Sequence, residues 1–404
     1  MMKKTIIQAP QIASGILSAL MVWTGGAMMI LTAAARLGLD QSSIVSWIFT
    51  VYVAGGILNI WLAVKYKIPF AGAHSLTAAA FLSMSAMEVS VPYLVGSFIM
   101  AGAIIVILGI TGLFQKLLHA IPKTIIDAML AGLILHYVVD IVPVFQHAPI
   151  VAILSLLGYF IIPKISKALP PLLGVLIFGI VGLLLVYDFP AMTQLPFSLP
   201  QFTIPKFSAT YLLSLSLPIA ILIISNDLAV ALAALKNNGY DVPTNKAIMM
   251  SGIATVAGGF FAGHAITVGG MMTTVCSSEQ TGEKDVRYKA GVVSSIFVIL
   301  FGLFAWKLVS LIQLLPSYFI AIITGFSLLN ILMNSLKSAF QHHSYRISAF
   351  LAFIIAIANV SFFGISAALW SLLIGTIAAK WYKESDTISI NITNQNKQQL
   401  KEEP

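Results

Sequence analysis

The chain has 404 residues, of which 59% are hydrophobic and only 9% are charged, and its mean hydropathy is +0.96. Soluble domains carry about 25% charged residues, so soluble enzymes, nucleic-acid binders and disordered chains are all disfavoured. The formal charge of +8 comes from scattered cations rather than a basic patch, and the composition predicts a polytopic membrane protein.

Fourteen apolar segments follow one another along the chain, and each is a candidate for crossing a membrane. They are residues 12–35, 44–64, 69–84, 91–114, 124–144, 150–163, 170–187, 209–235, 247–262, 264–278, 290–306, 315–336, 346–362 and 364–380. The first is too long for a signal peptide and has no clear cleavage site, so we expect an uncleaved span.

The distribution of lysine and arginine between the loops predicts the orientation of these spans. Seventeen cations fall in loops on one side, against three on the other, namely Arg36, Lys206 and Lys307. The seventeen are Lys3, Lys4, Lys65, Lys67, Lys116, Lys123, Lys164, Lys167, Lys236, Lys246, Lys284, Arg287, Lys289, Lys337, Arg346, Lys380 and Lys383. Because cytoplasmic loops are enriched in lysine and arginine, we expect both termini to be cytoplasmic and the protein to lie in the cytoplasmic (inner) membrane.

An internal repeat divides the chain into two halves. Residues 71–78 resemble residues 262–269, and the Gly-Leu-Phe at 112–114 recurs at 302–304, so both pairs are separated by about 190 residues. Seven spans per half is an odd number, so the halves are expected to have opposite orientations, as in secondary transporters. The expected divisions are a cytoplasmic N-terminus at 1–11, repeats at 12–188 and 209–383, a linker at 189–208 and a polar cytoplasmic tail at 384–404.

The short, glycine-interrupted segments at 69–84 and 264–278 occupy matching places in the two halves. Such segments are the best pointer in a sequence to a transporter binding site, because an unwound stretch leading into a half-helix leaves free backbone N–H groups near the bilayer midplane. The helix dipole adds about half a positive charge there, which predicts an anion site without a buried cation. The alternative is that these glycines only allow close helix packing.

Asp227 lies inside an apolar run that extends from Tyr211 to Leu235. A charge at the centre of a membrane helix costs about 2.5–3.5 kcal/mol on insertion scales, so Asp227 is a candidate for carrying a proton. The alternative is a protonated acid that is hydrogen-bonded to a neighbouring helix. Asp127, at the start of another span, is expected to be an interfacial or first-turn residue, with a functional role as the alternative.

Two histidines, His74 and His264, occupy the starts of the two predicted half-helices. Each histidine could bind substrate or relay a proton, or could be a neutral histidine hydrogen-bonded to the backbone. We expect His264 to take part in proton coupling together with Asp227. Trp23 could stack on an aromatic substrate or simply pack. The full set of candidate substrate-binding residues is Trp23, His74, Ser75, Thr77, Ser225, Asn226, Gly263, His264, Ala265 and Thr267.

Neither a metal nor a nucleotide is expected as a cofactor. Cys276 is the single cysteine, and no close ligand spacing is present among the histidines and carboxylates. A Gly-Lys-Ser/Thr phosphate-binding motif is also absent from the sequence, so ATP-driven transport by this chain is disfavoured and an enzyme is not predicted.

Several short stretches occur in a characteristic order, namely AARLGL at 34–39, KYKIP at 65–69, GHAI at 263–266, FGLF at 301–304 and AALW at 367–370. In these stretches, and over nearly its whole length, the chain resembles the benzoate:proton symporter (BenE-like) family. The resemblance implies an all-α fold of about fourteen transmembrane segments in two inverted seven-span repeats. It also implies a core domain containing spans 1, 3, 8 and 10, which moves past a gate domain formed mainly by spans 5–7 and 12–14.

The chain departs from the family pattern in spans 3 and 8. There it reads Ala-His-Ser-Leu-Thr-Ala at 73–78 and Asn-Asp-Leu-Ala at 226–229, so benzoate itself does not follow from the resemblance. The expected function is proton-coupled symport of a small aromatic or other organic acid. The expected partners are that acid, protons and the lipid bilayer, with a homodimer as a possible assembly and no nucleic acid. Two alternatives stay open, a nucleobase-like permease and a channel or non-transporting scaffold.

Overall fold

The computed structural model describes residues 7–84, 89–114, 121–166, 169–190, 197, 199–312, 314–341, 343–359, 362 and 366–384. In this part of the chain, all the regular secondary structure is helical, with one isolated bridge between His74 and Ile266. Several predictions concern residues outside these ranges, namely those for Lys3, Lys4, Lys116, Lys167 and the tail beyond Glu384.

The first half contains α1 (Ala9–Met21), η2 (Val22–Gly26), α2 (Ala27–Arg36), α3 (Gln41–Tyr66), α4 (Leu76–Met84), α5 (Val91–Thr111), α7 (Lys123–Val139), α8 (Ile141–His147), α9 (Pro149–Ile165) and α10 (Pro171–Val186). The second half contains α11 (Ala209–Tyr211), η3 (Leu212–Ser216), α12 (Leu217–Leu222), η4 (Ile223–Leu228), α13 (Ala229–Asn237), α14 (Thr244–Gly259), α15 (Gly270–Ser277), η5 (Glu279–Thr281), η6 (Lys284–Val286), α16 (Tyr288–Leu303), α17 (Ala305–Ile312), α18 (Ser317–Phe340), η7 (His343–Tyr345), α19 (Arg346–Ala358) and α20 (Ala367–Trp381).

The helices have the lengths and composition of a membrane protein. Within the described ranges, 7 helical stretches are long and apolar enough to cross a membrane, and shorter apolar helices of 10–17 residues accompany them. Many of these helices expose large apolar side chains on their outer faces. Contact with the hydrocarbon core of a bilayer keeps such side chains out of water. The predicted all-α polytopic membrane fold is therefore confirmed.

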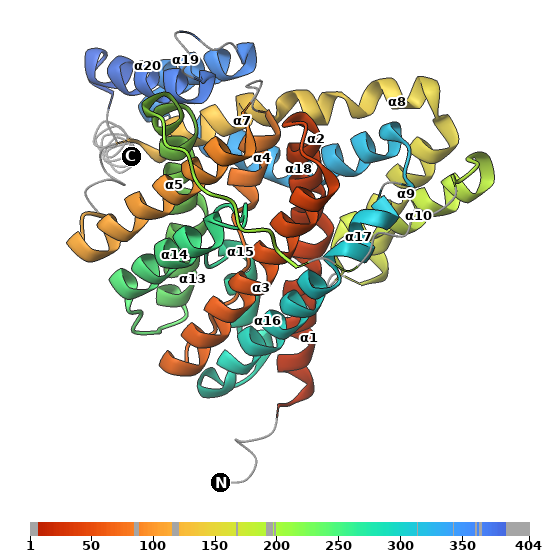
Figure 1. The fold of residues 1–404 in the computed structure, drawn as a ribbon, viewed down its shortest axis with the longest axis horizontal. Helices are drawn as coiled ribbons and strands as arrows, with labels where there is room; N and C mark the ends of the chain where they lie inside the picture. Colours follow the sequence, from red (N-terminus) through yellow and green to blue (C-terminus); the bar gives the residue numbers. More distant parts are fainter. Residues whose placement is uncertain are drawn as a thin grey trace, which may run out of the picture.

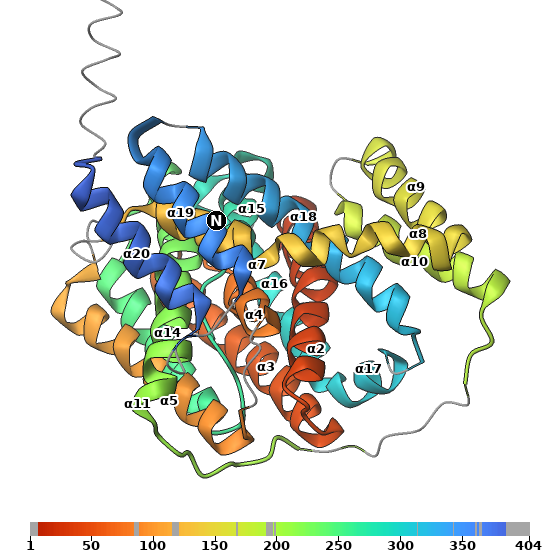
Figure 2. The ribbon, with the colours of Figure 1, turned by 90° about the horizontal axis from the view of Figure 1, so that it is seen from above.

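Helix packing separates the molecule into two groups of helices (Figure 1). In one group α5 packs on α14, α3 packs on α16, and α1 packs on α15 and α16. In the other, α7 packs on α18 and α19, α9 packs on α10, and α19 packs on α20. Figure 2 shows α8, α9 and α10 projecting to one side of the first group. We call the first group the core group, which also holds α4, through its contacts with α2 and α12, and η4, through its contacts with α13 and α15. We call the second the gate group, and it holds the spans 5–7 and 12–14 that the resemblance assigns to a gate domain.

The long helical stretch 209–237 changes its winding twice. Pro218 lacks an N–H and clashes with the preceding turn, and the wider turn η3 comes directly before it. A second wide turn, η4, contains Ser225, Asn226 and Asp227. Turns of this kind inside α-helices are frequent at functional sites. They rotate the polar residues of this span relative to a regular helix.

Two extended segments, 68–75 and 264–269, cross between the helices and lead into α4 and α15. They run antiparallel and pair through backbone hydrogen bonds. Ser75 N–H donates to Ala265 O at 3.0 Å, Thr267 N–H donates to Ala73 O at 3.2 Å, and Gly269 N–H donates to Ala71 O at 2.9 Å. The pairing satisfies backbone groups that the bilayer could not, and brings the starts of the two half-helices together.

Candidate functional site

Ser75 is the residue around which the site is organised, and each of its polar atoms is used. It precedes α4, and its Oγ accepts the Ala78 N–H at 3.0 Å, as an N-cap does. The Ser75 hydroxyl donates to Asp227 Oδ2. Its carbonyl oxygen accepts from both His74 and His264. Ser75 therefore connects the start of one half-helix, the carboxyl group of the opposite span and both histidines.

Asp227 is buried, with 7% of the residue exposed, and its carboxyl group faces the start of α4. Besides the Ser75 hydroxyl, Thr77 Oγ1 donates to Asp227 Oδ2 at 3.4 Å. The positive end of the α4 dipole and two hydroxyl donors thus face a single carboxyl oxygen. At this half-helix the protein's own carboxyl group occupies the position that the sequence assigns to an anion.

His264 is fixed in one tautomer by its neighbours. Trp47 Nε1–H, which can only donate, donates to His264 Nδ1 at 2.7 Å, so Nδ1 carries no proton. His264 Nε2–H then donates to Ser75 O at 3.3 Å. Both ring nitrogens are occupied, and a second proton on His264 would require the Trp47 hydrogen bond to break. In this conformation His264 is a structural support of the crossing segments.

We expect Trp47→Phe to lower the free energy of unfolding by about 1–3 kcal/mol, because it leaves His264 Nδ1 buried without a donor. Trp47 is completely buried, whereas Trp61 is 38% exposed, which makes Trp61→Phe a matched control with an expected change within about 0.5 kcal/mol. Thermal denaturation of the purified variants in detergent measures both. Equal melting temperatures for the two variants would contradict the assigned role of Trp47.

His74 differs from His264 because one of its ring nitrogens is free. Its Nδ1–H donates to Ser75 O at 3.4 Å, which leaves Nε2 as a buried acceptor without a hydrogen-bond partner among the described residues. The ring packs edge-on against Tyr52, with the centroids 5.2 Å apart, and lies 5.0 Å from the ring of His264. Of the two histidines, His74 is thus the one that can accept a proton or a donor group.

A cavity of about 300 Å³ lies between the two groups of helices. Small-molecule sites typically measure about 300–1,000 Å³, so it suits a small ligand. Its polar lining includes His74, Thr77, Asn226 and Asp227 from the core group. The apolar lining residues are Met21, Val22, Leu76, Leu130, Val230, Met271, Met272 and Ile331. An adjoining cavity of about 320 Å³ shares Met21, Leu76, Met271 and Ile331 with it.

The start of α15 also faces this cavity, through Gly269, Gly270 and Met271. Among the described residues, no side chain caps the first turn of α15, in contrast to α4, where Ser75 does so. A Cβ atom on Gly270 would lie 3.2 Å from the backbone oxygen of Asn226, so this helix start is close to the wide turn η4. The uncapped first turn of α15 is therefore a candidate source of the backbone donors predicted from the sequence, whereas at α4 Ser75 accepts one of them.

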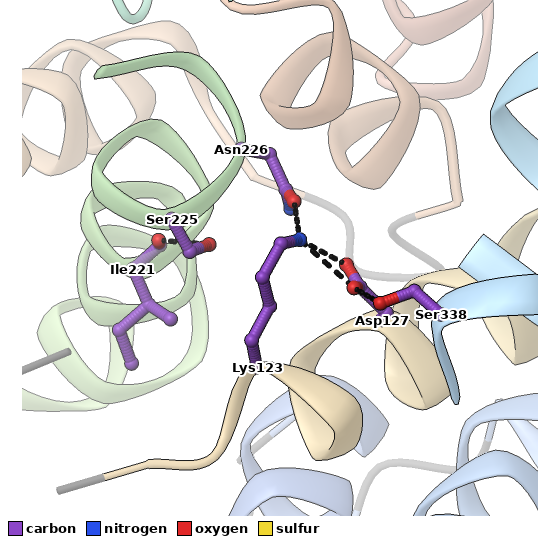
Figure 3. Close-up of polar contacts among 6 residues, drawn as sticks. All are labelled: Lys123, Asp127, Ile221, Ser225, Asn226 and Ser338. Atoms are coloured by element: carbon purple, nitrogen blue, oxygen red, sulfur yellow. Dashed lines mark hydrogen bonds and ion pairs between the residues drawn. The ribbon is translucent and has the colours of Figure 1, made fainter. Parts of the chain in front are cut away.

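A polar cluster on the gate side completes the cavity and is not evident from the sequence (Figure 3). Lys123 Nζ donates to both Asp127 oxygens, at 2.9 and 2.8 Å, and to Asn226 Oδ1 at 3.0 Å. Ser338 Oγ of α18 donates to Asp127 Oδ2. Asp127 is only 2% exposed and lines the cavity, so it is a buried residue of the protein. The four-residue spacing of Lys123 and Asp127 after Pro122 was the available signal.

The remaining predicted substrate-binding residues lie outside the cavity lining. Ser225 Oγ donates to Ile221 O at 2.8 Å, and Figure 3 shows it apart from the Lys123 cluster. Trp23 stacks on Phe301 with the ring centroids 5.3 Å apart, so one face of its ring is already covered. Ala265 and Thr267 belong to the extended segment 264–269 before α15, and Gly263, whose N–H donates to Gly258 O, directly precedes it.

Comparisons with known proteins agree with this fold. A family model described as "Benzoate membrane transport protein" matches residues 5–380. The benzoate membrane transport protein of Acinetobacter baylyi is 29% identical over 367 residues, which cover 90% of this chain and 93% of that protein. The inner membrane protein YdcO of Escherichia coli is 28% identical over 377 residues, covering 92% of this chain and 95% of that protein.

Two solved structures share the architecture at low sequence identity. The transmembrane domain of a cyanobacterium bicarbonate transporter, BicA, has a TM-score of 0.57 at 16% identity, covering 92% of this chain and 96% of that one. The murine anion transporter Slc26a9 in its inward-facing state has a TM-score of 0.60 at 14% identity, covering 92% of this chain and 68% of that one. These similarities show the fold alone.

Proposed function

The chain belongs to the family of benzoate membrane transport proteins, and from this premise we propose that it couples proton movement to the transport of a small aromatic carboxylate. The observation that carries the proposal is the position of Asp227. Its buried carboxyl group contacts the start of α4 and lines the cavity that separates the two groups of helices. Alternating access follows if the core group moves relative to the gate group around this cavity.

The charges around the cavity support coupling to protons. The charged side chains that line it, among the described residues, are Lys123, Asp127 and Asp227, which give a net charge of −1 when all are ionised. A carboxylate ligand would then enter a negatively charged, poorly hydrated space, which is unfavourable. Protonation of Asp227 removes that charge, so binding of the proton and binding of the anion favour each other.

The hydrogen bonds of Asp227 accommodate both protonation states. The hydrogen bonds from Ser75 and Thr77 go to Oδ2, which leaves Oδ1 to carry the proton. The free Nε2 of His74, which lines the same cavity, provides a second acceptor for a proton in transit. We therefore assign proton carriage to Asp227, with His74 rather than His264 as the neighbouring relay.

The apolar lining favours an aromatic substrate over a purely polar one. Methionine, leucine and isoleucine side chains surround the polar residues of the cavity, and flexible methionines adapt well to the face of a ring.

The loop charges given above support a location in the cytoplasmic membrane with both termini on the cytoplasmic side. The boundaries of the two repeats and a homodimeric assembly stay predictions.

Purified protein in liposomes should take up labelled benzoate when the outside is made acidic relative to the inside. Uptake should collapse when a protonophore abolishes the gradient, because the free energy that drives coupled entry of the proton and the anion is then lost. A panel of aromatic carboxylates, aliphatic carboxylates and nucleobases defines the substrate class. Gradient-dependent uptake of nucleobases alone would favour the permease alternative, and passive flux without saturation would favour a channel.

A further inference from the structure

We propose that Lys123 and Asn226 together bind the carboxylate group of the substrate, with Asp127 as the positioning residue that holds Lys123 in place. This inference rests on the proposed function, since it concerns the same cavity. It assigns the substrate's charge to a residue of the gate group, whereas the proton is carried by Asp227 in the core group. The first evidence is that Lys123 is the single cation among the described residues that line the cavity.

The geometry of Lys123 leaves one hydrogen-bond position that a ligand can take. A lysine ammonium has three N–H donors. Two of them are directed at the two oxygens of Asp127, at 2.9 and 2.8 Å, and the third contacts Asn226 Oδ1 at 3.0 Å. An amide oxygen is a weaker partner for an ammonium than a carboxylate is. A substrate carboxylate can therefore replace Asn226 Oδ1 while the ion pair with Asp127 stays intact.

Asn226 supplies the second donor. Its Oδ1 faces the ammonium, so its Nδ2 is the other arm of the amide, and that nitrogen is buried without a hydrogen-bond partner in the described structure. A buried donor with no acceptor costs about 1–3 kcal/mol, and a ligand oxygen would remove that cost. Lys123 Nζ and Asn226 Nδ2 can thus each donate to one oxygen of the same carboxylate.

The environment of Asp127 explains how Lys123 is positioned. Asp127 is buried, with a side chain 3% exposed, whereas the side chain of Lys123 is 52% exposed. Ser338 of α18 donates to Asp127 Oδ2, which ties the carboxylate to the neighbouring gate helix. Asp127 is therefore the fixed member of the pair and Lys123 the movable one. Because Asn226 lies on η4 of the core group, a carboxylate held by both residues would bridge the two groups of helices.

The test compares two single variants that remove the same ion pair from opposite sides. Lys123→Gln removes the cation and should raise the Kd for benzoate at least tenfold, measured by equilibrium binding of labelled benzoate to the detergent-solubilised full chain at fixed pH. Asp127→Asn removes the competing negative charge but keeps an amide oxygen that can still accept from Lys123 and Ser338, so Lys123 stays positioned and the Kd should equal or fall below that of the wild type. Lys123→Arg, which retains the charge, should keep the Kd within fivefold of the wild-type value.

A purely structural ion pair predicts a different result, because both single variants then lose the same interaction and weaken binding alike. A rise of less than tenfold in Lys123→Gln, or a rise in Asp127→Asn, overturns the inference. If Lys123→Gln does not fold, the neutral pair Lys123→Gln/Asp127→Asn replaces it, with the same tenfold threshold. Wild-type protein that binds no aromatic carboxylate overturns the proposed function itself, whereas wild-type binding without the Lys123 effect overturns this inference alone.

Discussion

Asp227→Asn is expected to abolish proton-driven uptake while leaving counterflow exchange partly intact. Asparagine is nearly isosteric with aspartic acid, and its amide oxygen can still accept the hydrogen bonds from Ser75 and Thr77 that hold the start of α4. It cannot, however, take up or release a proton, so the charge of the cavity no longer changes during the cycle. Gradient-driven uptake of labelled benzoate should fall to the background of empty liposomes.

Counterflow separates this effect from loss of the fold. Liposomes loaded with unlabelled benzoate exchange it for labelled benzoate without net proton movement, so the variant should retain a measurable fraction of wild-type exchange. Asp140→Asn is the matched control, because Asp140 is an exposed residue at the end of α7. This variant should take up benzoate like the wild type. Unchanged gradient-driven uptake in Asp227→Asn would remove Asp227 from the mechanism.

Gly72→Ala is expected to disrupt the crossing of the two extended segments. A Cβ atom on Gly72 would lie 2.3 Å from Gly269 N and 2.6 Å from Thr267 O, and both are backbone atoms that cannot rotate away. Overpacking of this kind typically costs about 1–3 kcal/mol, and here it separates the starts of α4 and α15. We expect a lower melting temperature in detergent and loss of both uptake and counterflow.

Gly25→Ala provides the comparison, since a Cβ atom at Gly25 meets nothing within 4 Å. Its melting temperature should stay within a few degrees of the wild-type value, and it should fold and insert normally. If Gly72→Ala were as stable as Gly25→Ala and transported at the wild-type rate, the close approach of the two segments would not be essential. That result would also weaken the assignment of the site to their crossing.

Much of the fold could be predicted from the sequence because the bilayer imposes strict rules on it. A continuous apolar run of the required length has to be a helix, since a lipid environment satisfies no backbone polar group. The short glycine-interrupted segments were therefore recognisable as departures from that rule, and both became extended segments followed by the half-helices α4 and α15. The scarcity of charge likewise made Asp227 conspicuous within its span.

The partners of these residues could not be predicted, because they come from distant parts of the chain. Trp47 and His264 are 217 residues apart, and their hydrogen bond fixes a tautomer that no local pattern encodes. Lys123 read as one of many loop cations until its contact with Asn226, 103 residues away, placed it at the cavity. Trp23 read as a candidate for substrate stacking, and only the structure shows that Phe301 already covers one face of its ring.

Hydropathy and the placement of cations are properties of the chain itself. The sequence alone therefore determined that this is an all-helical membrane protein with short, glycine-interrupted segments at matching places in its two halves. Tertiary structure decided which polar atoms are free. Ser75 is fully bonded, His264 has both ring nitrogens occupied, and His74 Nε2 and Asn226 Nδ2 have no partner among the described residues. The physical reason is that in a low-dielectric interior the chemistry of a polar group depends on its hydrogen-bond partners, and those are chosen by packing.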